Sequence, residues 1–223
     1  MPYLNLTDPI KRKVVTKAAL VFWITKGARQ IVVADATDAK VFSDAEVAEI
    51  QSLQVDIEQI SYQQDATHIV SKGKGYGEGR LIDFAITNSR ILGNSTHFYK
   101  STGKTFVRNF ADIRKIIDDN QIDCFFWKKI DPQHLMIPHL DCRFYLTSKQ
   151  YARQHLIPAY LRADDEVNAP CEQFLYETVS RTTTAGFAPR PFVHGLAGLN
   201  DQDYFDQSLG ALDMASPCWV LKR

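Results

Sequence analysis

The chain has 223 residues, 45% of them apolar and 11% aromatic, which is enough to bury the core of one domain. Its 26 basic and 26 acidic residues balance, so no global field draws the protein to nucleic acid or to an acidic membrane. Its four cysteines form no C-x-x-C pair, which argues against a metal cluster and against a dense disulfide framework.

The N-terminal segment lacks the charged head and apolar core of a signal peptide. No apolar run approaches the roughly 18 residues that a membrane helix needs. We therefore expect a soluble, cytoplasmic protein whose cysteines are buried thiols.

Helices and strands alternate in the first half of the chain. Asp8 and Pro9 are typical of an N-cap and first turn, and Gly27 is suited to a left-handed C-terminal cap. Ser43 is expected to cap the second helix. In chain order we expect a strand at 3–6, a helix from about 9 to 27, a strand at 31–37, a helix at 44–53, a strand at 55–62, a glycine-rich loop at 71–79 and a helix at 80–92.

The second half mixes strands and helices. We expect an aromatic strand segment at 97–99, a helix at 112–118, strands over 124–129 and 142–147 that pair with each other or with the main sheet, and helices over 149–160 and 171–179. Beyond residue 186, prolines, glycines and polar residues indicate irregular structure and short strands. The order predicts an α/β fold, with a mainly parallel central sheet flanked by helices and a mixed C-terminal half.

Four glycines occupy alternate positions in the segment 72–79, KGKGYGEG. Alternate glycines let a backbone approach a ligand closely, and Lys72 and Lys74 flank that path. A helix starting just afterwards would add its N-terminal dipole, so the segment predicts a phosphate or diphosphate site. The alternative is a flexible, solvated turn. The pattern G-x-G-x-x-G fails in both frames, which disfavours a Rossmann dehydrogenase.

A second basic motif, YKSTGKT at 99–105, contains the letters GKT of a P-loop. Phe98 stands where the Walker A motif requires glycine, so we reject a P-loop NTPase. Lys100 and Lys104 instead flank a turn at Gly103. Two ammonium groups there could neutralise a diphosphate leaving group without a divalent ion. The alternative is that both lysines are solvated surface charges.

These motifs resemble those of bacterial glycosyltransferases from capsule and lipopolysaccharide gene clusters, which have the nucleotide-diphosphosugar-transferase fold called GT-A. The resemblance covers about residues 30–180. It implies a single domain, 1–223, in which about 1–110 bind the nucleotide sugar and about 111–223 the acceptor. The matching stretches are IVVADAT (31–37), KGKGYGEGRLIDFAITNS (72–89), HFYKSTGKTFVRN (97–109) and, more loosely, CRFYLT (142–147) and CEQFLYETV (171–179).

The resemblance also implies how the donor is bound. In this fold the glycine-rich segment contacts the nucleotide, and the next strand normally ends in an Asp-x-Asp metal motif. Here it ends in the lysine motif, so we expect no divalent metal, no metal ligands and no other cofactor. Asp35 would contact the base or ribose, or else cap its loop, and Asp38 competes for either part. The predicted donor-binding residues are Asp35, Lys72, Gly73, Lys74, Gly75, Glu78, Lys100, Lys104 and His194.

Glu172 is the predicted catalytic residue. By resemblance it lies where inverting enzymes of this fold carry the carboxylate that deprotonates the acceptor hydroxyl. The alternative is a first-turn glutamate favoured only by the helix dipole. His194 would reach the donor phosphate, or else be a packed histidine. Asp141, Arg143 and Tyr145 alternate, so on a strand they would share one face and contact the acceptor sugar; Asp141 and Arg143 could equally be a surface pair.

The implied activity is that of a hexosyltransferase-like enzyme. It would transfer a sugar from a nucleotide-diphosphate donor, a UDP-sugar, to a surface-polysaccharide or lipid-linked glycan. The missing Asp-x-Asp motif keeps a second reading open, a catalytically inactive sugar-nucleotide-binding or scaffolding subunit of a polysaccharide assembly complex. No nucleic-acid partner is expected. Peripheral association with the inner face of the membrane, the oligomeric state and the stereochemistry of transfer stay open.

Overall fold

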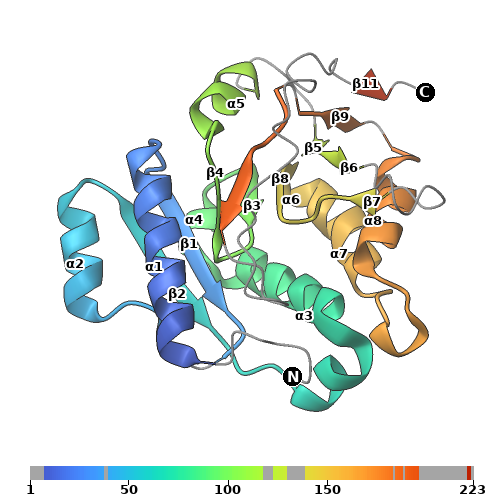
Figure 1. Cartoon of the computed structure of the whole chain (residues 1–223), viewed down its shortest axis with the longest axis horizontal. Helices are drawn as coiled ribbons and strands as arrows, with labels where there is room; N and C mark the ends of the chain where they lie inside the picture. Colours follow the sequence, from blue (N-terminus) through green and yellow to red (C-terminus); the bar gives the residue numbers. More distant parts are fainter. Residues whose placement is uncertain are drawn as a thin grey trace.

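The computed structural model describes residues 8–37, 40–117, 123–129, 139–182, 184–187, 189–195 and 220–221 as a mixed α/β protein (Figure 1). The first half holds α1 (Pro9–Thr25), β1 (Gln30–Asp35), α2 (Asp44–Ser52), β2 (Asp56–Ser61), α3 (Ala66–Asn88), α4 (Arg90–Gly93), β3 (His97–Ser101), β4 (Thr105–Val107) and α5 (Phe110–Ile117). The second half holds β5 (Cys124–Phe126), β6 (Lys128–Lys129), β7 (His139–Leu140), β8 (Phe144–Ser148), α6 (Lys149–Tyr151), the π-helical turn η1 (Ala152–Leu156), α7 (Ile157–Tyr160), the 3-10 turn η2 (Asp165–Val167), α8 (Cys171–Val179), β9 (Thr184–Gly186), β10 (Val193–Gly195) and β11 (Val220–Leu221).

The caps predicted for the first two helices are confirmed. The Asp8 side chain accepts from the amides of Ile10 and Lys11 at the start of α1, and Gly27 has a φ of 94° just after its end. At the start of α2, Ser43 and Glu46 form a reciprocal capping box. The strand expected at 3–6 lies outside the described residues.

The strands form a mixed set of sheets. Of the pairings among the described residues, β1–β2 and β5–β9 are parallel and the others are antiparallel. The largest sheet has the order β11-β9-β5-β8-β3. The prediction that 124–129 and 142–147 pair is confirmed by β5–β8, whereas the expectation of a mainly parallel central sheet is wrong for these residues. The antiparallel pairs β3–β8 and β5–β8 join strands that do not follow one another along the chain, so the order of elements did not reveal their direction.

The glycine-rich segment is a helix rather than the predicted loop. Residues 71–79 lie within α3, which is interrupted at Gly73, where φ is 87° and ψ is −175°. A Cβ atom on Gly75 would lie 2.6 Å from Cys171 Cβ, and one on Gly79 would lie 2.4 Å from Tyr160 Cβ. The glycines therefore let α3 approach α7 and α8 more closely than any side chain would allow. Their spacing of four places them on one helix face.

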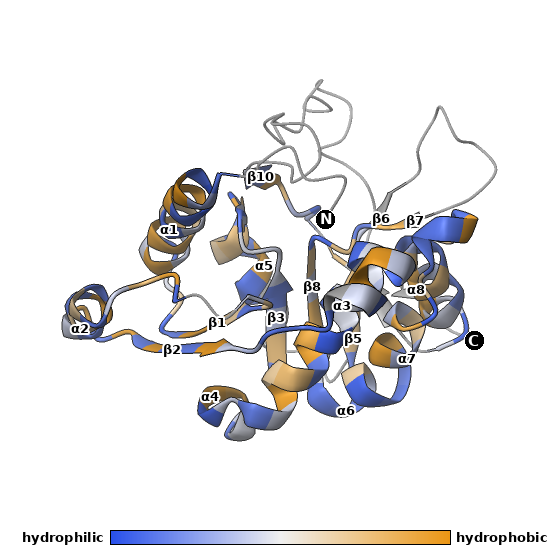
Figure 2. Cartoon of the chain, turned by 90° about the horizontal axis from the view of Figure 1, so that it is seen from below, coloured by the Kyte–Doolittle hydropathy of each residue, from blue (hydrophilic) through white to orange (hydrophobic). Residues whose placement is uncertain are grey.

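Three apolar clusters hold the elements together. One lies between α1, α2, β1 and β2 around Leu20 and Ile57, and a second joins α5, β4 and β8 around Phe144. The third and largest lies under α3, η1, α7 and α8. Figure 2 shows α1 and α2 at one end of the molecule and α7 and α8 at the other, with β3, β5 and β8 between them. The strands of the largest sheet thus lie between two groups of helices.

The helical region predicted at 149–160 contains a π-helical turn. The backbone N–H of Ile157 donates to the Ala152 carbonyl, five residues earlier, so η1 holds one residue more per hydrogen-bonded turn than an α-helix. The turn leads directly into α7, in which Tyr160 is fully buried. The π-helical turn therefore sets which side of α7 faces the interior.

Candidate functional site

A buried polar cluster lies where α3, β3, β8 and the start of α8 meet. It joins residues that are far apart in sequence, and most of it is enclosed by the largest apolar core. The sequence predicted site roles for Glu78, Lys100, Tyr145 and Glu172 separately, and the structure brings them together. The cluster consists of Glu78, Lys100, Cys142, Tyr145, Tyr160, Cys171 and Glu172.

Lys100 lies at the centre of this polar cluster. Its side chain is only 8% exposed and forms an ion pair with Glu78. The ammonium also donates to the Cys142 carbonyl oxygen at 2.6 Å and lies 5.6 Å from the centre of the Tyr145 ring. Burial alone would lower the pKa of Lys100, but the charge of Glu78 outweighs it and the pKa is raised. Lys100 is therefore a buried, paired cation, which differs from the solvated lysine of the alternative reading.

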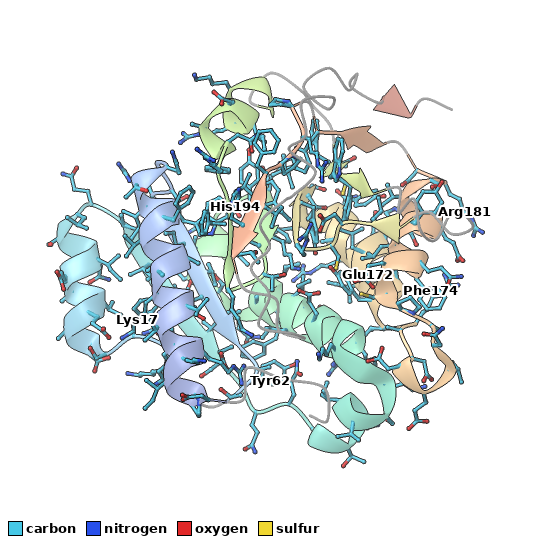
Figure 3. All side chains as sticks on the ribbon, viewed as in Figure 1. Lys17, Tyr62, Glu172, Phe174, Arg181 and His194 are labelled. Carbon is cyan, nitrogen blue, oxygen red and sulfur yellow. The ribbon has the colours of Figure 1, made fainter. Side chains whose placement is uncertain are left out.

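Glu172 lies in the first turn of α8, as the sequence predicted, and is partly exposed. The Cys142 thiol donates to Glu172 Oε1 at 3.3 Å, and the Cys171 thiol donates to Oε2 at 3.3 Å. Its carboxylate is thus held from two sides. Figure 3 shows Glu172 on the side of α8 that faces the middle of the molecule, whereas His194 lies on β10, closer to α1.

The thiols and phenols of the polar cluster are protonated at neutral pH. The hydrogen bond to Cys171, together with burial and the charge of Glu172, raises the pKa of Cys142 well above that of a free thiol. Burial raises the pKa values of Tyr145 and Tyr160 well above the usual phenol value. The charges of the cluster are therefore those of Glu78, Lys100 and Glu172.

The prediction that Asp141, Arg143 and Tyr145 share one face of a strand is wrong. β8 begins only at Phe144, and Asp141 and Arg143 lie in the turn before it. Their ion pair is largely enclosed, since the Asp141 side chain is 7% exposed, and Arg143 Nε donates to Asp141 Oδ1 at 2.8 Å. Tyr145 is fully buried. Alternate residues share one face only where the backbone is extended throughout, and here a turn interrupts the extended backbone. An acceptor-binding role for the three residues stays a prediction.

The basic residues of the glycine segment lie at a different contact. Lys72 Nζ donates to Asp164 Oδ2 at 2.7 Å, and the backbone amide of Lys74 donates to Asp165 Oδ2 at 3.4 Å. At the break in α3, a Cβ atom on Gly73 would overlap the Asp165 carboxyl group. The carboxylates of Asp164 and Asp165, at the start of η2, therefore occupy the place where the loop was predicted to hold a phosphate. Burial lowers the pKa of Lys74.

The other predicted donor residues lie apart from the polar cluster in the fold. Asp35 ends β1 and accepts from the Thr37 amide at 2.7 Å, which matches the loop-capping alternative. Lys104 lies in the turn between β3 and β4, where a Cβ atom on Gly195 would lie 2.1 Å from its carbonyl oxygen. His194 stacks on Phe106 with ring centroids 5.7 Å apart, a contact that the packed-histidine alternative expects. Donor-binding roles for Asp35, Lys104 and His194 stay predictions.

Sequence reasoning missed Cys142, Cys171 and Tyr160 as members of the polar cluster. Cys142 and Cys171 were expected to be buried thiols, and nothing in their spacing indicated that they meet. A weak signal was available: Cys171 directly precedes the predicted catalytic glutamate, at the start of a helix.

The chain matches no model of a known protein family, and it has no significant match among curated proteins. In the part of the chain that the structure describes, no helix has the length and apolar character needed to cross a membrane.

Proposed function

We propose that the protein is a glycosyltransferase that moves a sugar from a nucleotide-diphosphate donor, a UDP-sugar, to a hydroxyl of a surface-polysaccharide or lipid-linked glycan. The proposal includes the GT-A fold and assigns Glu172 as the general base. The observation that carries it is the placement of Glu172: a partly exposed carboxylate, held by two thiols, beside the buried Glu78–Lys100 pair.

The contacts of Glu172 suit a general base. Thiols are weak donors, so they orient the carboxylate while leaving lone pairs for a stronger donor such as an acceptor hydroxyl. Because Glu172 is partly exposed, that hydroxyl can approach from solvent. The carboxylate would take the hydroxyl proton as the oxygen attacks the anomeric carbon, while the nucleoside diphosphate leaves on the opposite face.

The edge of the parallel strands supports a donor site on the other side of α3. Asp35 and Ser61 are paired at the carboxyl ends of β1 and β2, the edge at which α/β sheets bind ligands. Gln64, just beyond β2, donates through Nε2 to the Gly77 carbonyl at 2.7 Å. That contact links the strand edge to the turn of α3 that carries Glu78. A donor at this edge would therefore lie against the helix that lines the polar cluster.

Lys100 receives a different role in this proposal from the one that the sequence suggested. The charge of Lys100 is already balanced by Glu78, so Lys100 would position the residues around Glu172 instead of neutralising a diphosphate. Lys104 and His194 remain the proposed diphosphate contacts. The pairing of Lys72 and Lys100 with carboxylates of the same chain also favours the second candidate, an inactive sugar-nucleotide-binding or scaffolding subunit.

Two measurements test the proposal. Calorimetric titration with UDP, GDP and CDP, each with and without chelator, should show chelator-insensitive binding of one nucleotide. UDP release from UDP-glucose, UDP-galactose and UDP-N-acetylglucosamine should then fall at least about 100-fold in Glu172→Gln, in line with general-base contributions, while nucleotide affinity is unchanged. Glu177→Gln, on the same helix and paired with Arg162, is the matched control.

The outcomes separate the two candidates. Binding of a nucleotide without turnover, and with no effect of Glu172→Gln, would favour the scaffolding subunit. Failure of every nucleotide to bind would contradict both.

A further inference from the structure

Cys142, Cys171 and Glu172 form a compact group of metal-ligating side chains. One ligand atom from each, the two sulfurs and a carboxylate oxygen, lie within 4.8 Å of one another. Cys142 and Glu172 are 30 residues apart in sequence, so the fold, and not a local motif, assembles the group. The two sulfurs are buried, while Glu172 is partly exposed and gives access from solvent.

The spacing of these atoms fits tetrahedral coordination. A metal with bonds of about 2.3 Å to sulfur and about 2.0 Å to oxygen gives a sulfur-to-oxygen edge of roughly 3.5 Å. Cys142 Sγ lies 3.3 Å from Glu172 Oε1, and Cys171 Sγ lies 3.3 Å from Glu172 Oε2. Each sulfur therefore lies at about this edge length from one of the two carboxylate oxygens.

The pKa values of both thiols are raised in the metal-free protein, so a cation must displace the two thiol protons when it binds. Two features of the surroundings stabilise the thiolates that result. Cys171 is the first residue of α8, a helix of nine residues, and the positive end of a helix stabilises thiolates. Lys100 holds the Cys142 carbonyl oxygen and brings a positive charge close to both sulfurs. Three protein ligands leave a fourth tetrahedral position for water, as in zinc sites that are not purely structural.

The charge of the polar cluster is also preserved on metal binding. Glu78 and Lys100 neutralise each other, and Glu172 carries one negative charge. One divalent cation replaces the two thiol protons, so the net charge does not change and no buried charge is left uncompensated. We propose that Cys142, Cys171 and Glu172 bind a thiophilic divalent cation, with Zn²⁺ as the best match to two sulfurs and one carboxylate.

This site carries a consequence for the proposed activity. A cation bound to Glu172 would occupy the carboxylate that is assigned as the base, so the metal-loaded protein would transfer sugar more slowly than the metal-free protein. The binding of the cation itself requires no nucleotide sugar. Metal binding and nucleotide binding can therefore fail independently.

Cobalt substitution tests the site directly. Metal-free, reduced protein is titrated with Co²⁺, and a sulfur-to-cobalt charge-transfer band should grow to one equivalent and disappear on addition of Zn²⁺. In weak buffer, about two protons should be released per cation. The doubly substituted Cys142→Ser/Cys171→Ser protein should lose the band, and Glu172→Gln should bind Co²⁺ about 10- to 100-fold more weakly, at least as much as loss of an outer-shell partner costs.

Glu177→Gln is the matched control and should bind Co²⁺ like the wild type, because Glu177 pairs with Arg162 outside the group. Circular dichroism of each metal-free variant shows whether it is folded. If the double cysteine variant fails to fold, the Co²⁺ affinity of Glu172→Gln alone tests the proposed site. Absence of the band in the wild type, or an unchanged band and affinity in the folded variants, would overturn the proposal.

Discussion

Helix α3 contributes one residue to each of two ion pairs between a lysine and a carboxylate, and the surroundings of the two pairs differ. Near its break, Lys72 pairs with Asp164, and the two side chains are 44% and 21% exposed. Six residues later, Glu78 pairs with Lys100, and the side chains of Glu78 and Lys100 are 27% and 8% exposed. The first pair lies at the surface, where water screens it, whereas the lysine of the second pair is enclosed by Tyr145, Cys142 and Cys171.

The comparison shows that the same kind of ion pair affects the stability of the protein differently in the two places. A screened pair contributes little and tolerates loss of one partner. In an enclosed pair, loss of one partner leaves a buried charge without compensation, although the pair as a whole stabilises the protein little relative to apolar side chains. The sequence motifs around the two lysines look alike, so their difference arises from the fold alone.

The largest expected effect is that of Glu78→Leu. This change leaves the Lys100 ammonium, whose side chain is 8% exposed, without a compensating charge, so the free energy of unfolding should fall by about 3–5 kcal/mol. Urea denaturation followed by circular dichroism measures the change. Adding Lys100→Met removes the uncompensated charge and should restore most of the loss. A single variant as stable as the wild type would show that Lys100 is not enclosed.

A smaller effect is expected from Gly79→Ala, which tests why the second pair is enclosed. The added methyl group would meet Tyr160 Cβ at 2.4 Å and push α3 away from α7. Overpacking of this kind costs about 1–3 kcal/mol, despite the better helix propensity of alanine. Gly93→Ala is the control, since no atom lies within 4 Å of its added Cβ, and it should be neutral or stabilising. Equal unfolding midpoints for the two variants would contradict the close packing.

The smallest effect is expected at the exposed pair. The hydrogen bond from Lys72 lowers the pKa of Asp164 below 3.8. A carboxyl group whose pKa is lower in the folded state stabilises the protein above its unfolded pKa, and this contribution is lost as the pH falls through the folded value. Lys72→Met should therefore slightly reduce stability at neutral pH and flatten its decline below pH 3.8. Thermal midpoints measured across the acid range check this, and an unaltered pH profile would count against the pair.

Local signals in the sequence predicted the starts of α1 and α2. Asp8 and Ser43 satisfy backbone amides within three residues of themselves, so their role depends on nearby atoms only. Gly27 likewise takes its left-handed conformation for a local reason. The types and approximate bounds of these first elements could therefore be read from the chain, whereas the first part of α3, from Ala66 to Gly79, could not.

The interior could not be read in the same way. Alternating glycines suit either a ligand loop or a helix pressed against its neighbour, and Tyr160 and Cys171, far along the chain, decide between the two. Lys100 and Glu78 look like ordinary surface residues until the fold encloses them. The placement of Glu172 in a first turn was predicted, but its two thiol partners depend on tertiary packing.

The π-helical turn Ala152–Leu156 behaves as a single-residue insertion in an otherwise α-helical segment. Because one residue corresponds to about 100° of rotation around a helix axis, winding the same residues as a regular α-helix would rotate everything that follows the turn by about that amount. Tyr160 would then turn away from Gly79 and out of the interior. The angular phase of α7, and with it one wall of the polar cluster, thus depends on the turn accommodating one extra residue.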